Sequence, residues 1–229
     1  LLDKCAPESA PKAVFTIGGP GAGKSFSIHL VLQDLELNAD SLMKIDPDDV
    51  LEKLFDNKNS VETRTTHINP LTDKMYEVAL RTKKSFISDG TGRNFAMISK
   101  RVAECKLQGF QTILVITAPD TSRRMTEIEK RAARTGRDTY MQLKTHIPFY
   151  MRIADATYLY ANRYDGKPIK VITSKCGKKT CHFSKDQMKD IEQVIDVSLF
   201  CPQQHLQNAI TRTVRMTRSQ NRAAVSDGV

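Results

Sequence analysis

The stretch Gly18-Gly19-Pro20-Gly21-Ala22-Gly23-Lys24-Ser25 fits the eight-position pattern of Gly, four variable residues, Gly, Lys and Ser or Thr. An apolar run over residues 13–17 precedes it, and apolar side chains at helical spacing follow it to about residue 37. A strand, a glycine-rich loop and a helix in this order predict a phosphate-binding loop. Its backbone N–H groups would surround phosphates, Lys24 would reach the terminal oxygens, and Ser25 would bind Mg²⁺. We therefore expect ATP or GTP with Mg²⁺ as cofactors.

Further strands and helices alternate along the chain. Expected strands cover residues 13–17, 42–45, 85–88, 112–117 and 168–173. Expected helices cover residues 24–37, 49–55, 70–82, 95–107, 121–135, 139–161 and 184–200. This alternation predicts an α/β domain with a mainly parallel sheet covered on both faces, and ligands bind such sheets at the carboxyl ends of the strands.

Three acidic residues, Asp46, Asp48 and Asp49, directly follow the second expected strand. Phosphoryl transfer to a hydroxyl needs a group that orients the acceptor and takes its proton, and an Asp is the usual solution. We expect Asp48 to be this base, with Asp46 as a second carboxylate beside metal and substrate. The alternative is that the three residues only cap the next helix, which is the role we expect of Asp49.

Composition narrows the classes of partner. The 229 residues include 35 basic and 26 acidic ones, and the resulting net charge of +9 favours anionic ligands. We find no apolar run long enough to span a membrane and no secretory signal. Five scattered cysteines favour a reducing compartment, and we expect a cytoplasmic protein. Because the chain begins at Leu1, we expect a fragment of a longer polypeptide.

Two of these motifs resemble the zeta-toxin family, P-loop kinases that phosphorylate UDP-N-acetylglucosamine and related amino sugars at the 3′-hydroxyl of the sugar. The phosphate loop is similar to that of the family, and Ile45-Asp46-Pro47-Asp48 resembles its Asp-x-Asp strand end. In the family the second Asp of this motif is the general base. The resemblance therefore implies the same role for Asp48.

Two later stretches extend the resemblance to residues 12–173. His67-Ile68-Asn69-Pro70, followed by Lys74 to Glu77, is similar to a family helix with a substrate-contacting Glu, which implies that role for Glu77. Ser88-Asp89-Gly90-Thr91-Gly92-Arg93 resembles the family's Glu-Gly-Thr-Gly-Arg loop, which contacts the sugar. Asp89, Thr91 and Arg93 are thus implied substrate contacts, and Asp89 joins Ser25 as an expected metal ligand. Asp in place of Glu shortens the reach by one methylene group.

A basic segment and a late asparagine complete the expected site. Arg131, Arg134 and Arg137 lie where this fold class has a lid that neutralises charge on the transferring phosphate, although a solvated basic helix face would look the same. The resemblance places Asn162 beside the nucleotide base. Tyr158 and Tyr160, in the same stretch, are expected to pack in the core.

We therefore expect a three-layer P-loop kinase fold with a mainly parallel sheet, a helical lid and a C-terminal helical extension. Residues 1–175 would form the kinase domain and residues 176–229 the extension with its basic tail. The expected activity is transfer of the γ-phosphoryl group to a small anionic acceptor, foremost a UDP-amino sugar, with a protein inhibitor as a further partner. A polynucleotide 5′-hydroxyl kinase and a non-catalytic nucleotide-binding module stay open as alternatives, with nucleic acid the less favoured partner.

Overall fold

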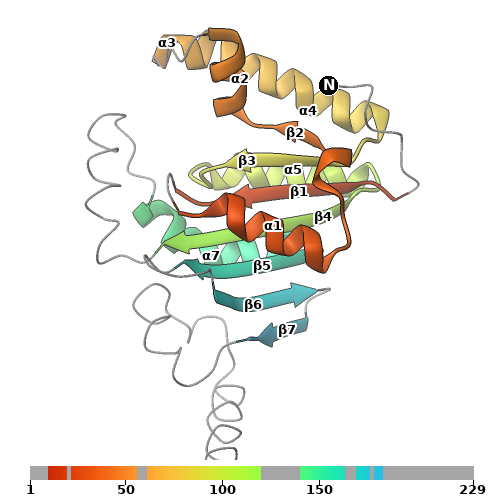
Figure 1. Cartoon of the computed structure of the whole chain (residues 1–229), viewed down its shortest axis with the longest axis vertical. Helices are drawn as coiled ribbons and strands as arrows, with labels where there is room; N and C mark the ends of the chain where they lie inside the picture. Colours follow the sequence, from red (N-terminus) through yellow and green to blue (C-terminus); the bar gives the residue numbers. More distant parts are fainter. Residues whose placement is uncertain are drawn as a thin grey trace, which may run out of the picture.

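The computed structural model describes residues 10–19, 22–55, 61–119, 140–162, 169–175 and 178–182. Within these ranges, one seven-stranded sheet has the order β2-β3-β1-β4-β5-β6-β7 (Figure 1). The first five strands of this order run parallel, and β6 and β7 are antiparallel to their neighbours. The strands are β1 (Lys12–Ile17), β2 (Met43–Ile45), β3 (Phe86–Gly90), β4 (Gln111–Pro119), β5 (Ala156–Asn162), β6 (Ile169–Lys175) and β7 (Lys178–Cys181).

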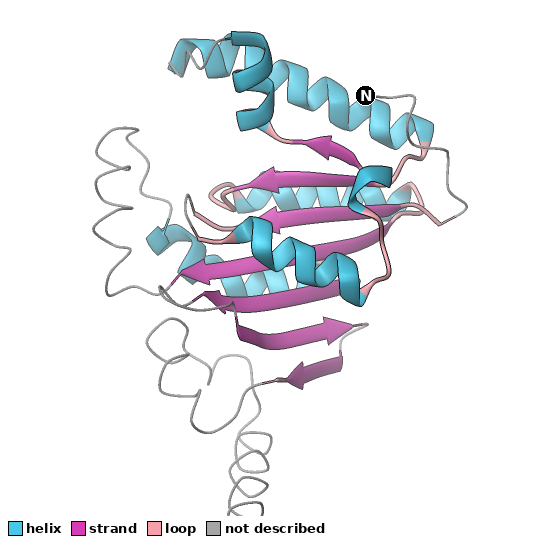
Figure 2. Cartoon of the chain, viewed as in Figure 1, coloured by secondary structure: helices cyan, strands magenta, loops and turns pink. Residues whose placement is uncertain are grey.

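Helices cover both faces of the sheet, as Figure 2 shows. On one face α1 packs Val31 against Val14 and Tyr158, and on the other α5 and α7 pack on the larger core around Leu114 and Phe86. These three layers confirm the expected α/β fold. The helices are α1 (Lys24–Asp34), η1 (Ala39–Ser41), α2 (Pro47–Phe55), α3 (Val61–Thr63), η2 (Arg64–Ile68), α4 (Asn69–Thr82), α5 (Phe95–Leu107) and α7 (Tyr140–Ile153).

A second, small core lies beyond β2, where α2, α3, η2 and α4 project past the edge of the sheet (Figure 1). Val50 and Leu51 of α2 meet Ile68 of η2, and Met75 of α4 packs against them. η2 is a five-residue π-helical turn between α3 and α4. The helix that follows Asp46 is therefore held mainly by its neighbouring helices.

The parallel register brings the carboxyl ends of five strands to one edge of the sheet. Thr16 of β1 pairs with Asp89 of β3, and Pro119 of β4 pairs with Asn162 of β5. The loops after these strands are therefore neighbours, as expected for an α/β ligand site.

The expected helix over residues 139–161 is wrong in its second half. α7 ends at Ile153, and β5 follows from Ala156, so Tyr158 and Tyr160 lie on a central strand. All seven residues of β5 are buried, which gives an apolar run without the alternation that identifies a strand. Asp155 fixes the start of the strand, because its Oδ2 accepts hydrogen bonds from the backbone N–H and the hydroxyl of Thr112, at 2.9 and 2.8 Å.

The sheet continues past residue 175, where we expected the C-terminal helical extension to begin. β7 pairs antiparallel with β6, and its Cys181 is disulfide-bonded, which the scattered cysteines did not predict. The expected helices over residues 121–135 and 184–200 lie outside the described residues. None of the helices in the described ranges has both the length and the apolar content needed to cross a membrane. The division of the chain at residue 175 stays a prediction.

Candidate active site

The phosphate loop lies between β1 and α1, the context that its sequence predicted. Gly23, at the start of α1, has φ +89°, and a Cβ there would lie 1.8 Å from Nδ2 of Asn162. Gly18 approaches β4 so closely that its Cβ would lie 2.8 Å from the carbonyl oxygen of Thr117. Both positions thus require glycine, one for its backbone conformation and both for space. Pro20 and Gly21 lie outside the described residues.

Asn162, at the end of β5, holds the phosphate loop through a hydrogen bond to its backbone. Its Nδ2 donates a hydrogen bond of 2.6 Å to the carbonyl oxygen of Ala22, and the residue is only 4% exposed. The expected contact of Asn162 with a nucleotide base stays a prediction, whereas the contact with the loop backbone was not expected. An amide from the end of β5 therefore anchors the loop that begins after β1.

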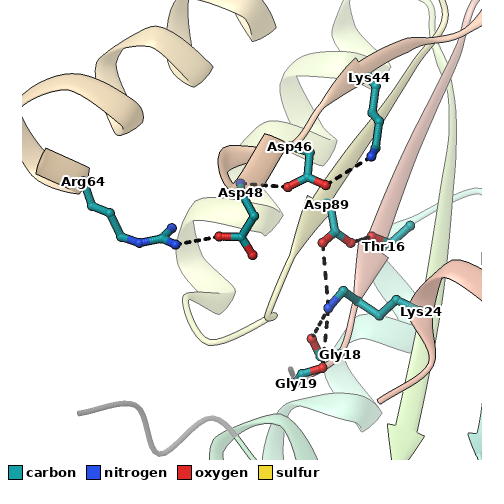
Figure 3. A network of polar contacts seen from close by, with 9 residues as sticks. All are labelled: Thr16, Gly18, Gly19, Lys24, Lys44, Asp46, Asp48, Arg64 and Asp89. Atoms are coloured by element: carbon teal, nitrogen blue, oxygen red, sulfur yellow. Dashed lines mark hydrogen bonds and ion pairs between the residues drawn. The ribbon is translucent and has the colours of Figure 1, made fainter. Parts of the chain in front are cut away.

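Lys24 is held at the centre of the site (Figure 3). Its Nζ donates to the carbonyl oxygens of Gly18 and Gly19, at 3.0 and 3.4 Å, and lies 3.7 Å from Oδ2 of Asp89. Ser25 is exposed in the first turn of α1. The loop, the lysine and the end of β3 thus form one contiguous polar cluster.

Asp89 supplies the carboxylate of this cluster. Its other oxygen, Oδ1, accepts a hydrogen bond from the hydroxyl of Thr16, and its side chain is 28% exposed. Burial raises the pKa of Asp89 above its usual value, Lys24 and Thr16 oppose this rise, and the charges of Asp46 and Asp48 add to it. A divalent cation at these oxygens would offset that repulsion. Carboxylates beside a serine hydroxyl are suitable ligands for Mg²⁺.

The three carboxylates after β2 have structural roles that differ from our expectation. Asp46 caps α2, because its Oδ1 accepts the backbone N–H of Asp48 at 2.9 Å. Asp49, the expected cap, instead forms an ion pair with Lys44 at 2.7 Å, and Lys44 also lies 3.4 Å from Asp46. The side chain of Asp48 is 70% exposed. Of the three carboxylates, Asp48 is the one turned furthest toward solvent at this edge of the sheet.

Arg64 reaches Asp48 from the neighbouring helical turn. Nη2 of Arg64 lies 2.6 Å from Oδ1 of Asp48, and Figure 3 shows that it approaches from the side opposite to Lys24. Arg64 is a functional candidate that sequence reasoning missed, because no phosphate-binding or catalytic motif includes it. Arg64 is the first residue of the π-helical turn η2, which sequence periodicity does not reveal.

A hollow of about 680 Å³ opens beside Asp89, between β3 and α5. Thr91 and Arg93 line it, as expected of a substrate loop. The loop is braced by α7, because the hydroxyl of Tyr150 donates to the carbonyl oxygen of Gly92 at 2.8 Å. The structure thus brings the three residues Asp89, Thr91 and Arg93 to one cavity, and Asp89 of this cavity contacts Lys24 of the phosphate loop.

Glu77 is placed apart from this cavity. It forms an ion pair with Lys74 at 2.9 Å and lines a second hollow of about 570 Å³ between α4 and α5, which shares Met97 and Arg101 with the first. Asp89, Thr91 and Arg93 do not line that hollow. The role of Glu77 in substrate binding stays a prediction. The expected lid residues Arg131, Arg134 and Arg137 lie outside the described residues.

Solved structures support the fold. A chain of the PezAT toxin–antitoxin system of Streptococcus pneumoniae matches with a TM-score of 0.53 at 17% identity, over 82% of this chain and 85% of that one. Chains of the AvrRxo1-ORF1:AvrRxo1-ORF2 complex match with TM-scores of 0.53 (native) and 0.51 (with ATP), at 13% and 14% identity. Each match covers 82% of this chain and 65% or 64% of the other, so this chain spans less than two thirds of their length.

No curated protein matches this chain. The family model described as Zeta toxin, in contrast, matches residues 1–188, which include the phosphate loop, the acidic turn and the β3–α5 loop. The matched segment is more than half of the 229 residues. The chain therefore belongs to the zeta-toxin family.

Proposed function

We propose that this chain transfers the γ-phosphoryl group of ATP or GTP, with Mg²⁺, to a hydroxyl group of a UDP-amino sugar. Family membership and the phosphate loop support the coarser assignment, a nucleotide-binding phosphotransferase. The observation that carries the finer proposal is the meeting of Lys24, Asp89 and Asp48 at one edge of the sheet, beside the cavity of the β3–α5 loop (Figure 3).

The donor nucleotide would bind at the start of α1. The backbone N–H groups there and the positive end of the helix favour phosphate oxygens. Lys24 would move from the carbonyl oxygens of Gly18 and Gly19 to the terminal phosphates. Ser25 and Asp89 would hold Mg²⁺, which supplies charge neutralisation on the phosphates when bound.

The acceptor would bind between the acidic turn and the β3–α5 loop. Asp48 would accept the proton of the attacking hydroxyl, because its side chain is exposed toward the acceptor side and Asp46 fixes its backbone. Thr91 offers a hydroxyl group and Arg93 a forked donor, which suits the diphosphate of a nucleotide sugar. The lid arginines, Arg131, Arg134 and Arg137, would neutralise charge in the transition state.

The PezAT and AvrRxo1 structures bear the names of a toxin–antitoxin system and of a two-component complex. This motivates a protein inhibitor as a further partner of the present chain. If expression of the chain is toxic and Asp48→Ala relieves the toxicity, the chain acts as a toxin and an inhibitory partner is expected. The absence of toxicity would count against both.

The test is transfer of labelled phosphate from ATP and from GTP to a panel of UDP-amino sugars and 5′-hydroxyl oligonucleotides. We expect a labelled UDP-amino sugar with the wild type and a loss of roughly 1,000-fold or more with Asp48→Ala. Asp40→Ala, which removes an exposed carboxylate from η1, is the control and should keep the activity. Labelled oligonucleotide would establish a polynucleotide kinase instead, and nucleotide binding without any product would leave a non-catalytic module.

A further inference from the structure

Asp48 and Arg64 form an ion pair of unequal exposure. The Asp48 side chain is 70% exposed, whereas that of Arg64 is 16% exposed, and Nη2 of the guanidinium lies 2.6 Å from Oδ1 of the carboxylate. Exposed ion pairs contribute ~1 kcal/mol of stability or less. Stability is therefore a weak reason for burying an arginine at this position.

The two residues are carried by the same small core. Asp48 lies in the first turn of α2, and Arg64 is the first residue of η2. Val50 and Leu51 of α2 pack on Ile68 of η2, one turn beyond Arg64. The packing that holds α2 thus also holds the backbone from which the Arg64 side chain extends. The ion pair therefore has a defined geometry.

The wider π-helical turn sets the direction of this arginine. An extra residue per turn interrupts the 3.6-residue period between α3 and α4, and such turns are frequent at functional sites. In Figure 3 the second oxygen of Asp48 points away from Arg64, on the side of Lys24. One carboxylate oxygen is thus occupied by the guanidinium, and the other faces the phosphate loop.

We propose that Arg64 is the positioning residue of the general base. It holds Oδ1 of Asp48 so that Oδ2 receives the proton of the acceptor hydroxyl. The hydroxyl oxygen then bonds to the γ-phosphorus, the bond from this phosphorus to the β–γ bridging oxygen breaks, and the nucleoside diphosphate leaves. This inference rests on the proposed function, and Arg64 acts in it through Asp48.

The test compares Arg64→Met, Arg64→Gln and Arg64→Lys with the wild type. The first two remove the charge, and we expect kcat to fall about 10- to 100-fold, because a misplaced catalytic group costs rate in this range. The KM for nucleotide should stay within about twofold, because Arg64 contributes only after binding. Arg64→Lys, which keeps the charge but not the fork, should recover part of kcat.

Lys170→Met is the matched control. Lys170 is a half-buried cation that forms an ion pair with Asp34. It lies on β6, near the edge of the sheet opposite to β2. Its loss should leave kcat and both KM values unchanged. If Lys170→Met lowers kcat as much as Arg64→Met does, the effect is a general one of losing an ion pair, and the proposal is wrong.

A double-mutant cycle separates positioning from direct binding. In an Asp48→Ala background, Arg64→Met should cause no further loss of residual transfer, because its target is gone. A further loss of tenfold, or a selective rise in the acceptor KM, would make Arg64 an acceptor-binding residue and overturn the proposal. An unchanged kcat in Arg64→Met would overturn it as well.

Crystal structures of the wild type and Arg64→Gln give a readout without turnover. We expect one Asp48 conformer in the wild type and several in the variant. If the wild type phosphorylates no acceptor, the proposed function fails, yet these structures still decide whether Arg64 holds Asp48. A single, unchanged Asp48 conformer in the variant would refute the positioning role independently of the reaction.

Discussion

The two halves of the site are built in different ways. The donor half, residues 18–19 and 22–25 with Asp89 and Asn162, is fixed by close packing of its backbone against the central strands. The acceptor half, residues 46–49 with Arg64, lies beyond the edge strand, where a small helical core holds the backbone and ion pairs orient the side chains. The first half tolerates no added atom at Gly23, and the second contains Asp48 with most of its side chain in water.

This difference follows from the chemistry of each ligand. Phosphates are bound by backbone N–H groups, whose positions can be set only by a rigid chain path. A hydroxyl acceptor needs one correctly placed carboxylate, which an ion pair can orient while the site remains open. We therefore expect steric changes to damage the donor half and charge changes to act mainly on the acceptor half.

Gly23→Ala should break the donor half and have the largest effect. A Cβ at Gly23 would meet Asn162 at 1.8 Å, and the left-handed backbone adds ~1–2 kcal/mol of strain. We expect nucleotide affinity, measured by calorimetry, to fall about 100-fold or more. Gly109→Ala is the control, because Gly109 has φ +80° but nothing within 4 Å of an added Cβ. It should lower stability by ~1 kcal/mol and leave the affinity unchanged.

Asn162→Ala tests whether the donor half depends on its tether. The carbonyl oxygen of Ala22 would lose its buried donor, which costs ~1–3 kcal/mol, so nucleotide affinity should fall about tenfold. The same variant removes the atoms that an alanine at position 23 would strike. Gly23→Ala should therefore cost less in an Asn162→Ala background. Strict additivity of the two losses would contradict the packing argument.

Asp89→Asn probes the border between the halves and should change stability and binding in opposite directions. The folded state raises the pKa of Asp89, so its ionised form opposes folding, and this cost appears as pH rises through the ordinary Asp pKa to the raised one. The variant should thus melt at a higher temperature than the wild type at pH 7, with no such gain at pH 3. Binding of the Mg²⁺–nucleotide complex should weaken. A variant that melts lower at pH 7 would refute the sign.

Lys44→Met should have the smallest effect and sharpens the account of the acceptor half. Lys44 pairs with Asp46 and Asp49 but is 55% exposed, so we expect a loss of ~0.5 kcal/mol or less in chemical denaturation. The acceptor KM should change by about twofold at most, and the change should disappear in 1 M salt, where the Debye length is about 3 Å. A larger effect that persists in salt would give this exposed pair a role we do not assign to it.

The sequence predicted the donor half better than the acceptor half. Gly18 to Ser25 carry a motif whose spacing is set by the ligand, and the strand before it is short and apolar, so its context could be anticipated. Arg64 carries no such signal, because its contact with Asp48 depends on one π-helical turn and on how two helices pack. Tertiary geometry of this kind leaves no local pattern.

Two further differences also have physical reasons. The sequence predicts a helix through residues 156–161 because a fully buried strand lacks alternation, whereas the expected packing of Tyr158 and Tyr160 in the core is confirmed. Asp46, rather than Asp49, caps α2 because the helix begins two residues earlier than the polar pattern indicated. Element boundaries depend on single hydrogen bonds, which composition does not encode.

The bond between Asn162 and Ala22 also has a consequence for the time course of synthesis. These residues are 140 positions apart, so a ribosome completes the glycine-rich motif long before it adds the side chain that tethers it. Because a ribosome adds about 5–20 residues per second, the synthesis of Ala22 and that of Asn162 are separated by roughly 7–28 seconds. A nascent chain that ends before β5 has the complete motif but lacks its anchor, and it acquires a tethered loop only when the fifth parallel strand joins the sheet.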